Sequence, residues 1–244
     1  MAGDISPRLV GILGGMGPLA TVELMKRVIE NTEAKRDQDH VPMFVANVPQ
    51  IPDRTEYLRG SGEDPRPVLI KLIRKLEEVG CEAIFMPCNT AHAFYEDLAS
   101  SASIPIFHMP ARTVYEAKRK GISELLLLAT MGTYLSGIYS ELGRKYGVKV
   151  LLPKEEIRKR VHEEIYKGVK AGSLRKDERI LKEIREEYGE VTILLGCTEL
   201  SILKSEFERE FNVIDPLDVS ARYLIDFSFR KISEEDLLPP RVIS

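Results

Sequence analysis

The chain contains 244 residues, of which 43% are hydrophobic and 30% are charged. This length and composition predict a folded protein with one large or two small domains and argue against a disordered chain. The 35 basic residues nearly balance the 38 acidic ones, so the charge does not favour nucleic acid as a partner. Neither a transmembrane stretch nor a signal peptide is recognisable, and we therefore expect a cytoplasmic protein without a membrane partner.

Short apolar runs alternate with amphipathic segments along the chain. The runs predicted to form strands buried on both faces in the first half are Val10–Leu13, Met43–Ala46, Ala83–Met86 and Ile104–Phe107. A helix is expected to begin at Pro18, and another is expected over 68–79, where apolar residues share one face. The strands predicted in the second half are Leu125–Ala129, Val148–Leu152, Val191–Leu195 and Val213–Ile214. Strands separated by helices predict parallel sheets with right-handed crossovers.

The two halves of the chain resemble each other. GILGGMGPLATVEL is similar to LLLLATMGTYLSGIY, and a glycine lies eight residues before a cysteine in both halves, at Gly80–Cys88 and Gly189–Cys197. This repeat predicts an α/β fold of two pseudo-symmetric domains, 1–111 and 112–216, each a parallel sheet flanked by helices. We expect the active site in the cleft between the domains, and the C-terminal helix, over about 217–244, to pack back on the first domain.

Cys88 and Cys197 occupy equivalent points of the repeat, each after a predicted strand and before a helix start that contains threonine. Ligands of parallel sheets bind at the carboxyl ends of the strands, so facing domains would place both thiols across one cleft. A helix N-terminus is expected to lower the pKa of each thiol. Two such thiols suit inversion of a carbon centre, because one removes a proton from one face and the other delivers a proton to the opposite face. Burial of both in the core and a disulfide between them are the alternatives.

Three other residues are assigned structural roles. Cys81 has no counterpart in the repeat and is expected to pack in the core. His92 lies four residues after Cys88, which allows a Cys–His nucleophile, but the spacing favours a structural or supporting role. His108 is likewise expected to be structural. The cysteines lack the spacing of metal ligands, so no metal site is predicted.

Six motifs occur in the order GILGGMGPLAT, AKRDQDH, PQIPDRTEYL, MPCNTAHAFYEDL, IYKGVKAGS and GCTEL. Together they closely resemble the cofactor-independent aspartate racemases of the aspartate/glutamate racemase superfamily, from about Val10 to Phe227. The resemblance implies a homodimer that racemises aspartate without pyridoxal phosphate or metal. It also implies that Cys88 and Cys197 are the catalytic acid/base pair, with Cys197 deprotonating the L-enantiomer and Cys88 the D-enantiomer.

Aspartate carries two carboxylates and an ammonium group, so its site needs cations and short polar groups. By the same resemblance, Arg54 and Lys170 bind carboxylate. Polar side chains at strand ends are expected to hydrogen-bond the substrate, namely Asn47, Asn89, Thr90, Thr130, Thr133 and Thr198. Backbone at Met16, Gly17 and Ala91 is expected to line the cleft. Glu199 has three open roles, as a helix cap, as the ammonium ligand or as a group that tunes Cys197.

The spacing of Gly15, Gly17 and Ala20 also matches the G-x-G-x-x-A pattern of dinucleotide sites. The second predicted strand is followed by Asn47 rather than an acidic residue that would bind a ribose, so we expect this loop to bind a substrate carboxylate instead. Alternatives to aspartate racemisation are a glutamate or broader racemase, a maleate-type isomerase with Cys88 as nucleophile, and a non-catalytic binder of acidic amino acids. A binder would need neither thiol.

Overall fold

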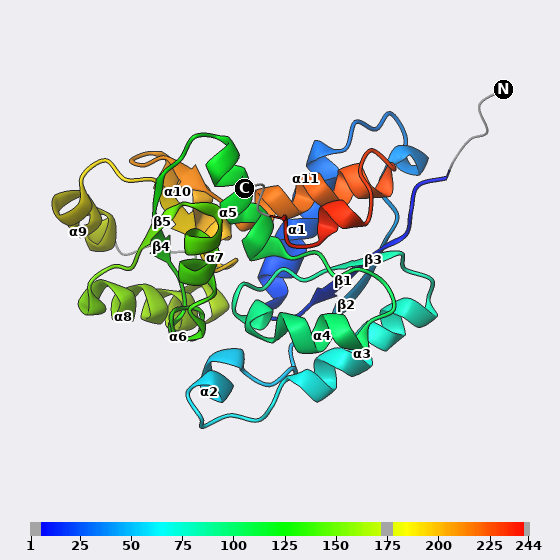
Figure 1. Cartoon of the computed structure of the whole chain (residues 1–244), viewed down its shortest axis with the longest axis horizontal. Helices are drawn as coiled ribbons and strands as arrows, with labels where there is room; N and C mark the ends of the chain where they lie inside the picture. Colours follow the sequence, from blue (N-terminus) through cyan, green and yellow to red (C-terminus); the bar gives the residue numbers. More distant parts are fainter. Residues whose placement is uncertain (1–5, 172–177, 242–244) are drawn as a thin grey trace.

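The computed structural model describes residues 6–171 and 178–241 and contains two parallel sheets flanked by helices (Figure 1). Residues 1–5 and 172–177 of the two expected domains and residues 242–244 of the expected C-terminal helix lie outside the described part. The first sheet has the strand order β2-β1-β3 and the second β5-β4-β6-β7. The strands are β1 (Val10–Gly14), β2 (Met43–Asn47), β3 (Ala83–Phe85), β4 (Glu124–Leu128), β5 (Lys149–Leu151), β6 (Ile193–Leu195) and β7 (Val213–Ile214). All neighbouring strands pair in parallel, and the predicted fold class is confirmed.

The helices of the first half are α1 (Pro18–Asn31), α2 (Arg54–Leu58), α3 (Arg66–Glu78), α4 (Tyr95–Ser101) and α5 (Met109–Arg119). Those that follow are α6 (Met131–Ser136), α7 (Ile138–Tyr146), α8 (Glu155–Glu163), α9 (Glu178–Tyr188), α10 (Lys204–Glu208) and α11 (Pro216–Ser228). Helix α1 begins at Pro18 as predicted, since a proline needs no N–H partner in the first turn. None of the helices among the described residues is long and apolar enough to cross a membrane.

Each sheet has an apolar core on both of its faces, because successive side chains of a strand point to opposite sides. In β4, Leu126 and Leu128 pack with residues of α8 and α9. Leu125 and Leu127 of the same strand pack instead with residues of α5 and α7. This alternation explains why the predicted strands are continuous apolar runs.

Two of the strand predictions are wrong in part. Strand β2 is not buried on both faces, because it lies at the edge of the first sheet and leaves Phe44 46% exposed. The segment Ile104–Phe107 is not a regular strand and forms a single parallel bridge, between Ile106 and Ile84. Its backbone makes two bonds to Ile84, through the carbonyl of Pro105 and the amide of Phe107, and proline itself has no N–H to extend the ladder.

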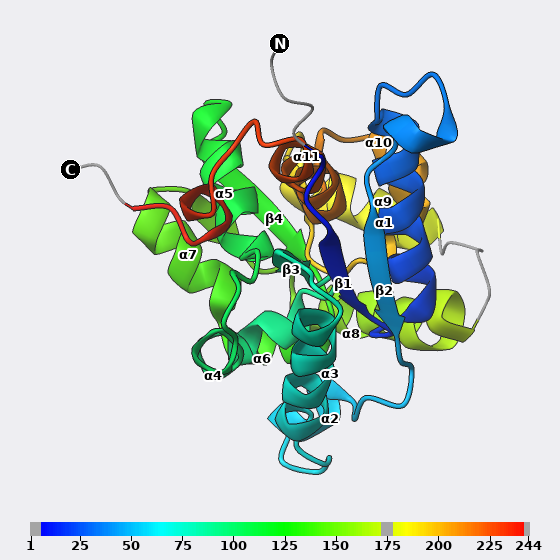
Figure 2. The same ribbon diagram turned by 90° about the vertical axis from the view of Figure 1, so that its right-hand side faces the viewer.

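Helix α11 packs beside α1, on the first domain (Figure 1, Figure 2). Its Leu217 and Leu224 share an apolar cluster with Val10 and Ile12 of β1. Helix α5 contains the expected domain boundary, which lies between residues 111 and 112, and its inner face packs on the second sheet. The chain therefore crosses between the two sheets twice, through α5 and again through α11.

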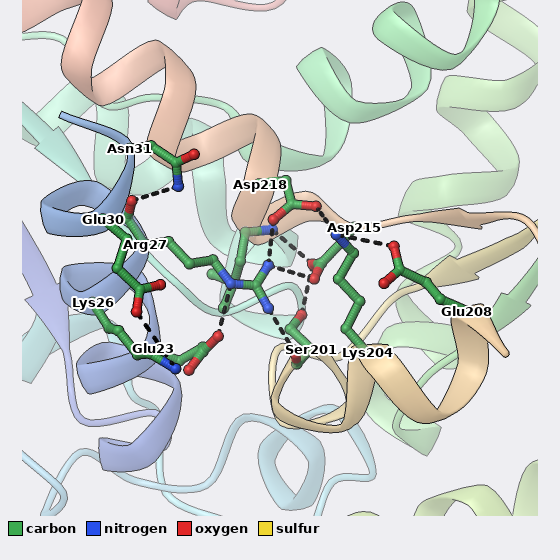
Figure 3. A network of polar contacts seen from close by, with 11 residues as sticks. Glu23, Lys26, Arg27, Glu30, Asn31, Ser201, Lys204, Glu208, Asp215 and Asp218 are labelled. Carbon is green, nitrogen blue, oxygen red and sulfur yellow. Dashed lines mark hydrogen bonds and ion pairs between the residues drawn. The ribbon is translucent and has the colours of Figure 1, made fainter. Parts of the chain in front are cut away.

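A buried polar network fixes α1 to α11 and to the turn that follows Cys197 (Figure 3). The guanidinium of Arg27 donates to the carboxylates of Asp215, at 2.5 Å, and Asp218, at 2.7 Å. It also donates to the backbone carbonyl of Ser201 at 2.6 Å. The Ser201 hydroxyl donates in turn to Asp215. Because Ser201 belongs to the second domain, this network braces one domain against the other.

Candidate active site

The loops that follow the carboxyl ends of five strands meet between the two sheets and enclose a small cavity. The empty space among these loops is about 240 Å³ with the adjoining open solvent included, which is too little for a dinucleotide. Its lining residues are Met16, Arg54, Thr55, Cys88, Asn89, Thr90, Thr130, Tyr166, Lys170, Cys197, Thr198 and Glu199. Both repeat-equivalent cysteines thus face one cavity, and both are free thiols.

Cys88 has a cation as its neighbour. It lies in the loop after β3, and the guanidinium of Arg54, at the start of α2, lies beside its side chain. The guanidinium also donates to the carbonyls of Ile51, at 3.2 Å, and Met16, at 3.2 Å, which fix its position. Burial acts to lower the pKa of Arg54, but Cys88 and other acidic neighbours outweigh it and raise that pKa. Arg54 therefore remains a cation in the cavity.

Cys197 has an anion as its neighbour. Its thiol donates a hydrogen bond to Oε2 of Glu199, with 2.9 Å between the two atoms. Burial raises the pKa of Cys197 well above its usual value, and the Glu199 carboxylate raises it further. Lys170 faces the same carboxylate, which raises the pKa of the lysine although burial acts to lower it. The cavity therefore contains two cations, Arg54 and Lys170, and one thiol, that of Cys197, which is paired with a carboxylate.

The expectation that a helix N-terminus lowers the pKa of each thiol is wrong for Cys197. The segment after it is only a short 3₁₀ helix, Leu200–Leu203, which begins three residues after the cysteine. A single turn carries a weak dipole, whereas complete burial and the neighbouring Glu199 carboxylate both favour the neutral thiol. Of the three roles considered for Glu199, the structure shows a direct contact with Cys197.

The two domains are joined at this cavity by side-chain hydroxyl groups. Thr90 of the first domain lies 3.0 Å from Thr130 and 2.8 Å from Thr133 of the second, measured between hydroxyl oxygens. In the opposite direction, the hydroxyl of Thr198 donates to the carbonyl of Pro87 at 3.0 Å. The loop that carries each cysteine is therefore bonded to the other domain.

Four of the predicted binding residues do not line the cavity. Asn47 is exposed at the end of β2. Ala91 is buried in the apolar core of the first domain. The Thr133 hydroxyl contacts those of Thr90 and Thr130 instead of facing the cavity. Gly17 lies against Glu199, because a Cβ atom at this position would be 2.8 Å from Oε1 of that residue.

Two residues that line the cavity, Thr55 and Tyr166, were not predicted from the sequence. Tyr166 precedes Lys170 by four residues, and the Lys170 ammonium lies 4.2 Å from the centre of its ring. The Tyr166 hydroxyl contacts both carboxylate oxygens of Asp53, at 3.1 and 3.0 Å. Since Asp53 caps the N-terminus of α2, this contact connects the lysine segment to the helix that presents Arg54. A spacing of four residues within a helical segment was the available signal for Tyr166.

The two buried histidines have structural roles. The amide of Met109 donates to Nε2 of His92, so Nδ1 carries the proton and donates to the carbonyl of Cys88 at 2.8 Å. Burial lowers the pKa of His92 to about 4, which makes it neutral and unsuited to act as a base for the thiol. Nδ1 of His108 accepts from the amide of Ala111 and caps α5.

Cys81 lies in the apolar core of the first domain and does not line the cavity. Within residues 6–171 and 178–241, no cluster of three or more His, Cys, Asp or Glu side chains is arranged to hold a metal ion.

Comparisons with known proteins identify the family. The sequence profile of the Asp/Glu/hydantoin racemase family matches residues 13–224. The chain is similar to an aspartate racemase structure from Picrophilus torridus, with 33% identity, a TM-score of 0.83 and coverage of 93% of this chain and 97% of the other. It is 26% identical to a broad specificity amino-acid racemase of Bacillus subtilis, over 85% of this chain and 92% of the relative. A glutamate racemase of Aquifex aeolicus is 32% identical over 62% of this chain and 61% of its own length. The chain belongs to the Asp/Glu/hydantoin racemase family.

Proposed function

We propose that this protein interconverts L- and D-aspartate by moving a proton at the α-carbon between Cys88 and Cys197, without a cofactor. The observation that carries this proposal is that both thiols line one cavity together with two cations, Arg54 and Lys170. A two-base racemase needs acid/base groups on opposite sides of the substrate carbon. A dicarboxylate substrate needs two positive charges.

The charges of the cavity complement those of aspartate. Arg54 and Lys170 provide cations for its two carboxylates. Glu199 offers Oε1, which is buried and has no hydrogen-bond partner in the structure, while its Oε2 accepts from Cys197. We assign this free carboxylate oxygen to the substrate ammonium group, because a buried carboxylate oxygen without a donor is costly. Glu199 would then connect the ammonium group to the thiol.

Each direction of the reaction uses the same two groups in exchanged roles. With L-aspartate bound to the form of the enzyme whose one shared proton resides on Cys88, the Cys197 thiolate takes the α-proton, and the Cys88 thiol gives a proton to the opposite face of the carbanion. With D-aspartate bound, the Cys88 thiolate takes the α-proton and the Cys197 thiol gives one. The substrate carboxylate next to the α-carbon gains charge during each transfer, and a neighbouring cation such as Arg54 stabilises that charge.

The similarity of this chain to the aspartate racemase of Picrophilus torridus, which extends over 97% of that protein's length, favours aspartate as the substrate. The broad specificity and glutamate racemases among the relatives make glutamate the competing substrate. We also propose that the protein acts as a cytoplasmic homodimer, which light scattering of the purified protein would test.

Incubation of the reduced enzyme with L-aspartate in D₂O tests the proposal. We expect deuterium at the α-carbon and the appearance of D-aspartate, with slower turnover of L-glutamate under the same conditions. Binding of aspartate without exchange would instead indicate a binding protein. Faster exchange of glutamate than of aspartate would show that glutamate is the preferred substrate, and conversion of maleate would indicate an isomerase.

A further inference from the structure

Only one end of the Asn89 side-chain amide has a hydrogen-bond partner in the structure. Asn89 lines the cavity directly after Cys88 and is 2% exposed. Its Oδ1 accepts a hydrogen bond from the hydroxyl of Tyr139, on α7 of the second domain. Its Nδ2 is buried and has no hydrogen-bond partner in the structure. Leaving a buried N–H donor unpaired is costly, which indicates that a ligand supplies the acceptor.

Tyr139 determines which end of the amide points toward the cavity. The residue is fully buried in the core of the second domain, and burial raises the pKa of its phenol well above the usual value. The hydroxyl therefore keeps its proton and requires an acceptor. Of the two ends of the Asn89 amide, only Oδ1 can accept a hydrogen bond. With Oδ1 bound to Tyr139, the Nδ2 group is left on the side of the cavity.

We propose that Tyr139 is a positioning residue for the substrate: by binding Oδ1 of Asn89, it presents the Nδ2 donor group to a carboxylate of aspartate. This inference rests on the proposed function, because it requires an anionic substrate in the cavity. A rotated amide would present its oxygen to the carboxylate, and two acceptors repel each other. The contact also makes a binding group of the first domain depend on a side chain of the second.

The pseudo-symmetry of the molecule supports this role. Thr198 follows Cys197 as Asn89 follows Cys88, and Thr198 also bonds across the interface, to the carbonyl of Pro87. The residue after each cysteine is thus fixed by the opposite domain. At Thr198 the bond is made through its own hydroxyl, whereas Asn89 keeps a free donor for the ligand.

Tyr139→Phe tests the role, since it removes the hydroxyl and nearly preserves the shape of the side chain. We expect the KM for both enantiomers of aspartate to rise about 10-fold, as for a lost hydrogen bond to a charged group, with a smaller change in kcat. In an Asn89→Ala background, where the amide is already absent, the same substitution should change KM less than about 2-fold. Wild-type turnover in the same assay tests the proposed function independently.

Tyr146→Phe is the matched control. Tyr146 lies on the same helix, is buried, and donates its hydroxyl proton to the carbonyl of Pro240 instead of to a cavity residue. Its loss should lower the urea midpoint of unfolding and leave KM unchanged. The inference is overturned if Tyr139→Phe behaves in the same way, or if it raises KM equally with and without Asn89.

Discussion

The thiol of Cys197 donates its proton to the carboxylate of Glu199, with 2.9 Å between Sγ and Oε2. Cys88, at the equivalent point of the repeat, lies beside the Arg54 guanidinium instead. Two residues related by pseudo-symmetry therefore have neighbours of opposite charge. In the two-base mechanism that we propose, one cysteine acts as acid while the other acts as base, and this arrangement would make Cys197 the acid before substrate binds.

Replacing Glu199 with Gln should lower the pKa of Cys197. The carboxylate raises that pKa by repelling the thiolate and by accepting the thiol proton, and the neutral amide removes the charge. The Cβ chemical shift of labelled Cys197, followed against pH, measures the change, and Glu30→Gln, at an exposed carboxylate, is the control. A titration that stays unchanged in Glu199→Gln would show that burial alone keeps the thiol neutral.

Substitution of either cavity cysteine by Ala should reduce racemisation about 100-fold or more, the usual contribution of a positioned acid or base. The assay is the change of optical rotation from each pure enantiomer. Cys81→Ala is the control, because Cys81 is also buried and free but does not line the cavity; it should lower stability and leave kcat unchanged. Near wild-type turnover in Cys88→Ala or Cys197→Ala would contradict the two-base mechanism.

The fold could be predicted because buried parallel strands are continuous apolar runs, and the repeat indicated two such sheets. The exceptions arise from tertiary context. Met43–Ala46 is as apolar as the other runs, yet it forms an edge strand and leaves Phe44 exposed. Ile104–Phe107 contains Pro105, which interrupts the ladder. Nothing local to either segment shows how many neighbouring strands it will have.

The cavity was predictable where its residues lie in recognisable motifs, as Cys88, Arg54 and Lys170 do. The protonation state of Cys197 could not be predicted, because it depends on burial and on the rotamer of Glu199 rather than on sequence position. Tyr139 was also missed, since its partner lies 50 residues away and in the other domain. Contacts between domains leave no periodic signal in either segment.

Acid should destabilise the protein as the pH falls below about 6.5, because both buried histidines are held neutral. Burial lowers the pKa of His92 to about 4 and that of His108 to about 3. Above pH 6.5 the folded and unfolded states carry the same neutral rings. Below pH 6.5 the histidines bind protons in the unfolded state but not in the folded state. The free energy of unfolding therefore decreases until the pH reaches the pKa of each histidine in the folded state. For His92 the loss amounts to about 3 kcal/mol.

Urea unfolding at a series of pH values measures this loss. His92→Asn keeps an N–H donor for the Cys88 carbonyl and cannot titrate, so stability should fall less steeply between pH 6.5 and 4 than in the wild type. His40→Asn, in the loop before β2, is the control for histidine removal outside the core. Equal slopes for His92→Asn and the wild type would show that His92 does not govern the acid transition.

Arg27→Met should destabilise the protein by about 3–5 kcal/mol, because it leaves the buried Asp215 carboxylate without its cation. Lys26→Met, one residue earlier on α1, is the matched control. Its ammonium is exposed and lies 3.9 Å from Glu30 (Figure 3), so its loss should cost less than about 1 kcal/mol. Urea unfolding measures both values. Because Arg27 also binds the carbonyl of Ser201, two residues after Glu199, Arg27→Met should lower racemase activity as well. A similar small cost for both variants would show that the network does not brace the domains.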